Sequence, residues 1–365
     1  AGALAGAAAA AAVVAALSLP DDPGRVQPAP RPMPTPVPSA QAPDGTVMVR
    51  MPSVAQEPRL SLHPSRLPET LDLAGPTTPL SEVRRAGGLD RVAAAYLRPV
   101  LENWAPVVVT GNGAVDLEVV LLPTSDAQGN TGAPLDRDAI AGDGSAVAFA
   151  QPGAVVLLDV ASSRVWRVPV DDPHLEHVGW TVGDTGLVAR SETTSWFVDP
   201  EARTVRRLPE RAAPSHYEVT AREEGRASLR VWDAFGRGRG ELPFRAPVTE
   251  VFGQSFTNLG GWAAAGVYLT SDVSSRLDGA YQGILAVQAD SPATRRLLVA
   301  GDGQGRAKGC CPPLGWVSGH ELLYRADHAE GTRLLVWDIT TGEVRRVSTL
   351  TGTGPGAAPL AVALP

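Results

Sequence analysis

Short apolar runs alternate with turns rich in glycine and acidic residues from about residue 90 to residue 350. The pattern consists of two half-repeats, each present in five copies. The first runs from an apolar residue or a tryptophan through a turn into a short strand, in residues 139–150, 180–190, 218–230, 262–270 and 316–325. The second is a strand, an acidic turn and a strand rich in arginine and valine, in residues 155–170, 196–209, 229–244, 284–299 and 334–349. A more divergent sixth copy covers residues 91–123.

Each copy predicts about four short strands joined by tight turns. Asp143-Gly144 and Glu224-Gly225 mark two hairpins, because glycine readily adopts the positive φ that such turns need. No helical apolar stripe of useful length follows residue 100. A sheet of four short strands cannot bury its own faces, whereas radial stacking of several such sheets buries them. The pattern therefore predicts an all-β protein, a β-propeller with six blades, and leaves five or seven blades open.

Two segments outside the repeats are candidates for closing the ring. A propeller commonly closes when a strand near one terminus pairs with the blade formed at the other end. Thr70–Leu73 and Leu360–Leu364 have the apolar character that such strands require. We therefore expect the propeller domain to span residues 67–365.

The repeats resemble WD-repeat and TolB-like β-propellers. The resemblance rests on the hydrophobic-Trp-Asp turns at Val231-Trp232-Asp233 and Leu335–Gly342, and on the hairpin at 143–149. The Gly-His pair of WD repeats is absent apart from Gly319-His320, which falls in a hairpin turn. The resemblance covers about residues 90–350, concerns architecture, and implies no catalytic residues.

The region before the repeats divides into two parts. Residues 1–19 carry no charge and could span about 28 Å as a helix, close to the thickness of a bilayer core. They predict a transmembrane anchor, with a signal peptide or a buried alanine-rich helix as alternatives. Residues 20–66 are proline-rich, with prolines alternating from Pro28 to Pro38, and predict a disordered, extended linker. The whole layout resembles membrane-anchored actinobacterial propeller proteins, which implies a propeller held outside the cytoplasm; a secreted protein is the alternative.

Composition narrows the function classes. The net charge of −7 argues against nucleic acid as a partner, because phosphate binding needs a basic surface. Only two cysteines are present, which excludes a disulfide-dense scaffold and a cysteine-rich zinc site. They are adjacent, at Cys310 and Cys311. Outside the cell such a pair oxidises, either to a ring between neighbours or to bonds with other molecules, so a structural disulfide, buried thiols and a redox role all stay open.

The tryptophans predict packing between blades. Trp180, Trp262 and Trp316 share one repeat position, each after a glycine, and recurrence at one position is typical of a structural role. A ligand site would use such a residue once. The other half-repeat gives the same reading for Trp232 and Trp337.

Charged and catalytic motifs are few. His174 and His177 lie on either side of Glu176 in a segment next to a proline. We expect this segment to be a solvated loop and not a metal site, because the further ligands that a metal needs are missing. The sequence contains no nucleophile elbow, zinc-protease helix or phosphate-binding loop. Three recurring arginine pairs are predicted to lie on solvated outer strands, at 206–207, 295–296 and 345–346.

These observations favour a non-enzymatic binding or scaffold module, tethered to the membrane, for an envelope protein or a wall component. We expect no catalytic residue, no cofactor and no metal. A sensor half of a transmembrane regulator, similar to an anti-sigma factor, is one alternative, because the chain begins with alanine and not with methionine. A propeller hydrolase or lyase is the other, and it would require a cluster of carboxylates or histidines in the mouth of the channel.

Overall fold

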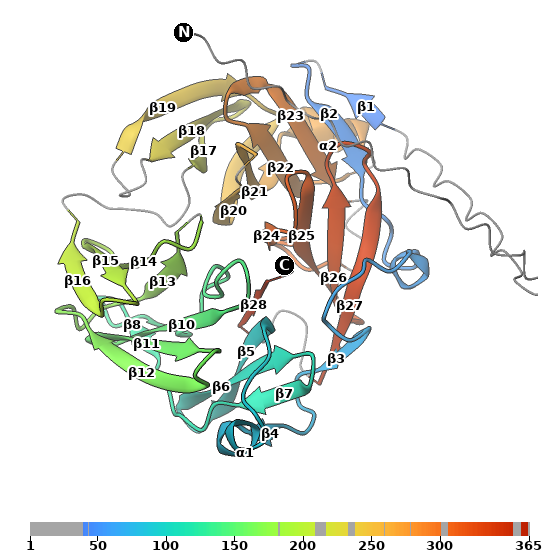
Figure 1. Cartoon of the computed structure of the whole chain (residues 1–365). Coiled ribbons are helices and arrows are strands. Elements are labelled where there is room, and N and C mark those ends of the chain that lie inside the picture. The colour runs from blue at the N-terminus through green and yellow to red at the C-terminus, as the bar shows by residue number, and fades with distance from the viewer. Residues whose placement is uncertain are drawn as a thin grey trace, which may run out of the picture. The chain divides into compact units, whose positions relative to one another are not determined.

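Six β-sheets are arranged as blades around a centre in the computed structural model of the chain (Figure 1). The structure describes residues 39–42, 44–181, 183–208, 217–232, 238–258, 260–277, 279–300, 306–352 and 359–363. All of them belong to one compact unit that starts at Pro36. The predicted anchor at 1–19 and the first part of the predicted linker lie outside the described residues.

The blades follow one another in chain order. Blade 1 contains β5 (Val92–Val100), β6 (Asn103–Thr110) and β7 (Gly113–Asp116), and blade 2 contains β10 (Ala146–Gln151), β11 (Ala154–Asp159) and β12 (Arg164–Pro169). Blade 3 contains β13 (His177–Trp180), β14 (Leu187–Arg190), β15 (Ser195–Asp199) and β16 (Thr204–Arg207). Blade 4 contains β17 (Tyr217–Glu223), β18 (Arg226–Trp232) and β19 (Gly238–Arg245).

The last two blades have four strands of the repeat each. Blade 5 contains β20 (Val248–Thr257), β21 (Trp262–Leu269), β22 (Gln282–Gln288) and β23 (Ser291–Val299). Blade 6 contains β24 (Pro313–Trp316), β25 (Glu321–His328), β26 (Gly331–Asp338) and β27 (Val344–Thr351). The remaining elements are the hairpin of β8 (Thr124–Ser125) and β9 (Thr131–Gly132), and the short helices η1 (Glu57–Arg59), α1 (Leu80–Arg85) and α2 (Ser271–Arg276).

Segments from both ends of the chain complete the sheets. Strand β28 (Leu360–Val362) pairs antiparallel with β5 of blade 1, and Leu360 lies opposite Tyr96. Strand β3 (Thr70–Asp72) extends blade 6 by pairing parallel with β27, and β4 (Thr78–Pro79) extends blade 1 next to β7. Both candidate closing segments therefore form strands that join first and last blades, as predicted.

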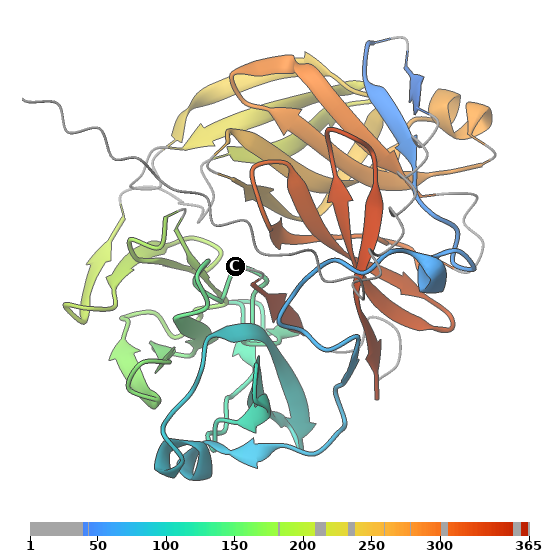
Figure 2. The same ribbon diagram turned by 45° about the vertical axis from the view of Figure 1, so that its right-hand side comes forward.

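The predicted linker boundary at residue 67 is too late. Strands β1 (Ser39–Gln41) and β2 (Val47–Arg50) form a hairpin, and β2 pairs parallel with β23 at the edge of blade 5 (Figure 2). Met48 and Val49 are buried there, at 6% and 4% exposure. The proline content of residues 20–66 led to the prediction of a linker, although the segment contains a short apolar strand that covers an otherwise open sheet edge.

Added strands also correct the prediction for two of the three arginine pairs. Strand β3 covers β27, which carries the half-buried Arg345 and Arg346, and β2 covers β23. Arg206 is exposed on the outer strand β16, as expected. Arg295 on β23 is only 6% exposed, because β2 covers its strand, and its guanidinium donates to the Thr46 hydroxyl and the Asp44 carbonyl. A strand that looks like an edge within its own repeat is thus an inner strand of the folded sheet.

The glycines of the two predicted hairpin turns adopt a positive φ. Gly144 and Gly225 have φ values of 75° and 76°, as predicted for the two hairpins. A Cβ at Gly144 would lie 2.5 Å from the carbonyl oxygen of Val92, so the turn also needs glycine for its contact with blade 1.

Apolar side chains fill the spaces between most neighbouring blades. Large buried clusters join blades 1 and 2, 2 and 3, 4 and 5, 5 and 6, and 6 and 1. None of the clusters formed by the described residues joins blades 3 and 4. Within the same ranges, no helix combines the length and apolar character needed to cross a bilayer.

Candidate functional site

A cavity of about 680 Å³ lies where the inner strands of blades 3, 4 and 5 approach the centre. Strands β13, β14, β17 and β20 line it, together with the segment 135–137 that precedes blade 2. It borders the junction of blades 3 and 4, which the described apolar clusters leave unfilled. Ionisable side chains from different blades therefore meet in one place.

Asp136 and His177 form a hydrogen-bonded pair in this cavity. The Asp136 carboxylate accepts from His177 Nδ1 at 2.9 Å and from the backbone N–H of Val178 at 2.7 Å. This hydrogen bond raises the pKa of His177 above its ordinary value, against the opposing effect of burial. No described residue bonds to Nε2 of this ring, and the His177 side chain is 45% exposed. The pair thus presents a basic nitrogen whose ring orientation is fixed by a carboxylate.

Asp138 lies next to this pair and behaves differently. Burial raises its pKa to about 7, and the neighbouring charge of Asp136 acts in the same direction. Its Oδ2 accepts from Gln254 Nε2 at 2.8 Å, while its buried Oδ1 has no partner among the described residues. A Cβ at Gly179 would lie 2.2 Å from Oδ2, so the carboxyl occupies the space that this glycine leaves.

Two arginines on the cavity wall have few partners. Arg137 donates one hydrogen bond, 3.4 Å long, to the carbonyl oxygen of Pro313. Burial, and to a smaller extent the positive charge of Arg325, lower the pKa of Arg137 to about 10. Arg190 lies directly opposite His177 in the β13–β14 pairing, and its buried Nε has no partner among the described residues.

These groups can bind a charged or polar ligand and can transfer protons near neutral pH. A carboxyl that titrates near 7 beside a histidine–aspartate pair is the arrangement that general acid–base chemistry requires. No set of three or more histidine, cysteine, aspartate or glutamate side chains in the described ranges is placed to hold a metal ion.

Comparison with known proteins gives matches among solved structures. No protein-family model matches the chain, and no curated protein matches its sequence. A solved structure from Lactobacillus plantarum is similar at 13% identity and a TM-score of 0.43, covering 82% of this chain and 89% of that one. The C-terminal WD40 domain of Sif2 is similar at 9% identity and a TM-score of 0.36, covering 78% and 74%. For the acylaminoacyl peptidase of Pyrococcus horikoshii the identity is 14% and the TM-score 0.43, covering 72% and 45%.

At these identities and TM-scores the matches carry no argument, and the fold class rests on the sheets of this chain. The ring of six sheets and its closing strand decide the class. The protein is a six-bladed β-propeller. The β-propeller expected from the repeats is therefore confirmed by the sheet topology.

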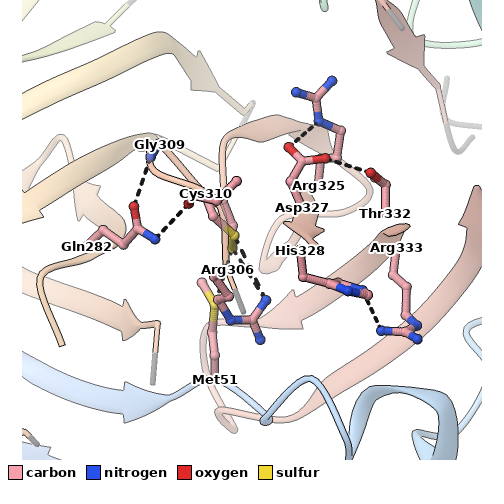
Figure 3. Close-up of a disulfide and its surroundings, with 12 residues drawn as sticks. Met51, Gln282, Arg306, Gly309, Cys310, Arg325, Asp327, His328, Thr332 and Arg333 are labelled. Atoms are coloured by element: carbon pink, nitrogen blue, oxygen red, sulfur yellow. Dashed lines mark hydrogen bonds and ion pairs between the residues drawn. A yellow bond between two sulfur atoms is a disulfide. The ribbon is translucent and has the colours of Figure 1, made fainter. Parts of the chain in front are cut away.

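The adjacent cysteines lie between blades 5 and 6 of the propeller, beside Arg306 and Met51 (Figure 3), and are not among the residues that line the cavity. Cys310 and Cys311 are bonded to each other as a disulfide and are 1% and 0% exposed. Arg306 Nη1 lies 3.9 Å and 3.8 Å from their sulfur atoms, and Met51 Sδ lies 3.7 Å from Cys311 Sγ. Of the pairings that the sequence left open, the structure contains the bond between neighbours.

A buried ionic cluster adjoins the disulfide. Glu57 of η1 is fully buried, and its two oxygens bind Arg306 and Arg333 at 2.7 Å and 2.8 Å. Arg333 also donates to His328 Nε2 at 2.6 Å, and burial lowers the pKa of His328, so that the ring stays neutral and accepts. Arg306 further donates to the Pro52 carbonyl, which ties the N-terminal segment to blade 6.

Most of the predicted packing tryptophans contact neighbouring blades. The indole N–H of Trp180 donates to Ala139 before blade 2, and that of Trp316 donates to Phe256 of blade 5, each at 3.0 Å. Trp337 is fully buried between blades 5 and 6. Trp232, at the end of β18, is half-buried.

Trp262 is not equivalent to the others. It lies after the hairpin turn, at the start of β21, whereas Trp180 and Trp316 lie before the turn, at the ends of first strands. The shared glycine that precedes all three made their positions look alike in the sequence. Trp262 still packs, half-buried, against the apolar cluster between blades 5 and 6.

Sequence reasoning missed the cavity residues. It assigned His177 to a solvated loop, whereas His177 begins β13 and binds Asp136. It gave no role to the run Asp136-Arg137-Asp138. The available signal was a cluster of three charges directly before the apolar start of a repeat, where the chain enters the inner side of a blade.

Proposed function

We propose that this propeller is a binding module that takes a small polar ligand in the cavity at blades 3 to 5. The observation that carries the proposal is the cavity of about 680 Å³ lined by ionisable side chains from separate blades. A volume in this range is typical of small-molecule sites. The rigid ring of blades holds the groups in place, and a carboxylate orients His177.

The second part of the proposal concerns location. Residues 1–19 anchor the chain in the cell membrane, and the propeller acts outside the cytoplasm for an envelope protein or a wall component. The uncharged first 19 residues and a layout that resembles that of membrane-anchored actinobacterial propellers support this location. The disulfide adds support, because such bonds persist in oxidising compartments. We expect the full chain to stay with membranes after an alkaline wash, and a chain lacking residues 1–19 to be released; equal release would contradict the anchor.

A ligand screen against a blocked cavity tests the binding function. Thr220→Trp places an indole on the cavity wall, where Thr220 of β17 lies. Compounds from a panel of small sugars, amino acids and organic acids should raise the melting temperature of the full chain and fail to do so in Thr220→Trp. Thr204→Trp, on the exposed start of β16, is the matched control and should keep every response. If no compound acts, or if Thr220→Trp responds like the wild type, the cavity is not the binding site.

A propeller hydrolase or lyase is a second candidate function. The Asp136–His177 pair and the Asp138 carboxyl, whose pKa is about 7, favour it, because they can serve as base and acid. The same panel distinguishes the two functions when each compound is followed by mass spectrometry during incubation with the protein. Consumption of a compound by the wild type and not by Thr220→Trp would identify an enzyme, and binding without consumption would identify a binding module.

A further inference from the structure

We propose that the ligand of the cavity carries a carboxylate, and that Arg137 and Arg190 bind it. This inference rests on the proposed function and names the chemical class of the ligand. It follows from two half-buried arginine side chains that line one cavity and make no hydrogen bond to a carboxylate of the described residues.

Arg137 provides the first observation. A guanidinium has five N–H donors, and that of Arg137 uses one of them in a 3.4 Å bond. No carboxylate of the described residues lies within 4.0 Å of the Arg137 guanidinium. Burial lowers the pKa of Arg137, which shows that its surroundings disfavour the charge. Asp136, Asp327 and Asp138 act on this guanidinium as nearby charges that raise its pKa, but its remaining N–H donors are unused, so an anion that enters the cavity would gain a strong partner.

The backbone opposite Arg137 gives it room. Gly253 of β20 lines the same cavity with a φ of 71°, and a Cβ there would lie 2.9 Å from Arg137 Nη1. A side chain at this position would therefore press on the guanidinium. The glycine keeps the cationic group accessible from the cavity.

Arg190 provides the second observation. It faces His177 across the β13–β14 pair, and directly opposed residues of an antiparallel pair lie on one face of the sheet. The structure shows no side-chain hydrogen bond or ion pair of Arg190 within the described ranges. Asp138 interacts electrostatically with both arginines. The charge of Arg190 lowers the pKa of Asp138, and the charge of Asp138 raises the pKa of Arg137.

The remaining charges favour a carboxylate over a phosphate. Asp136, Glu218 and Glu250 line the same cavity, so a dianion would meet three negative groups beside the two cations. A carboxylate carries one charge and matches the planar fork of arginine. The acidic wall at Glu218 and Glu250 suits hydroxyl or ammonium groups on the rest of the ligand. We therefore expect a polar molecule with a single carboxylate at one end.

Matched acid and neutral probes test the inference on the wild-type full chain. D-glucuronate is compared with D-glucose, D-gluconate with D-glucitol, and both acids with inorganic phosphate, by isothermal titration calorimetry. We expect at least one acid to bind tenfold or more tightly than its neutral partner and than phosphate. Tighter binding of phosphate, or equal binding of acid and neutral probes, would overturn the carboxylate assignment.

Variants then locate the carboxylate. Arg137→Met and Arg190→Met each keep an unbranched side chain without charge and should weaken binding of the acid at least tenfold. Arg206→Met, on the exposed strand β16, should leave it unchanged, and near-ultraviolet circular dichroism checks that each variant is folded. Unchanged affinity in both cavity variants would refute the inference. If neutral probes bind and Thr220→Trp abolishes their binding, the proposed function stands without the carboxylate; if no probe binds, both fail.

Discussion

Replacing Glu57 by glutamine should lower the free energy of unfolding by about 3–5 kcal/mol, the range observed when one partner of a buried ion pair is removed. Glu57 is fully buried and forms ion pairs with Arg306, whose side chain is 2% exposed, and Arg333, whose side chain is 11% exposed. The neutral glutamine would leave both cations in the interior beside the disulfide. Urea unfolding followed by tryptophan fluorescence measures the loss.

Glu69→Gln is the matched control. Glu69 pairs with Arg346 at 3.7 Å but its side chain is 68% exposed, so solvent screens the pair and its loss should cost less than about 1 kcal/mol. A second variant tests the electrostatic reason. Adding Arg333→Met to Glu57→Gln removes one stranded cation, so the double variant should lose less than the sum of the two single changes. If Glu57→Gln lowers the free energy of unfolding as little as Glu69→Gln does, the buried ion pairs do not stabilise the fold and the prediction is wrong.

The architecture was predictable because its signals are local. The alternating apolar strands, the Asp143-Gly144 turn and the two closing segments all lie within short stretches of sequence, and each fixes backbone geometry by itself. The segment 47–50 could not be recognised in this way. Its partner β23 lies almost 250 residues further along the chain, and that pairing places it at the edge of blade 5.

The cavity escaped prediction for the same reason. Asp136 and His177 are 41 residues apart, and Asp138 and Gln254 are 116 residues apart. A propeller assembles its centre from one strand of each blade, so no spacing of residues along the chain predicts the site. Glu57 shows the limit most clearly, because a glutamate in a proline-rich segment reads as solvated until Arg306 and Arg333 are placed beside it.

Replacing Asp138 by asparagine should stabilise the protein above pH 7 and change little near pH 4. Burial raises the pKa of Asp138 in the folded state to about 7, against 3.8 as its ordinary value. The folded state therefore holds this proton more tightly than the unfolded state does. As the pH rises from 4 to 7, the unfolded carboxyl ionises first, and the free energy of unfolding of the wild type falls. This interval of pKa corresponds to about 4 kcal/mol, which is the upper limit of the expected gain.

Asparagine resembles the protonated carboxyl in shape and can still accept a hydrogen bond from Gln254. It therefore avoids the fall in the free energy of unfolding without removing that hydrogen bond. The pKa of His177 is also raised, which makes stability fall with pH in both proteins, so the two are compared by urea unfolding at each pH between 4 and 9. Asp126→Asn is the control. The hydrogen bond from Asn130 lowers the pKa of that exposed carboxyl, so its removal should give no gain above pH 7. If Asp138→Asn shows no gain either, Asp138 is ionised in the folded protein without penalty, and the second candidate function loses the neutral-pH acid that it requires.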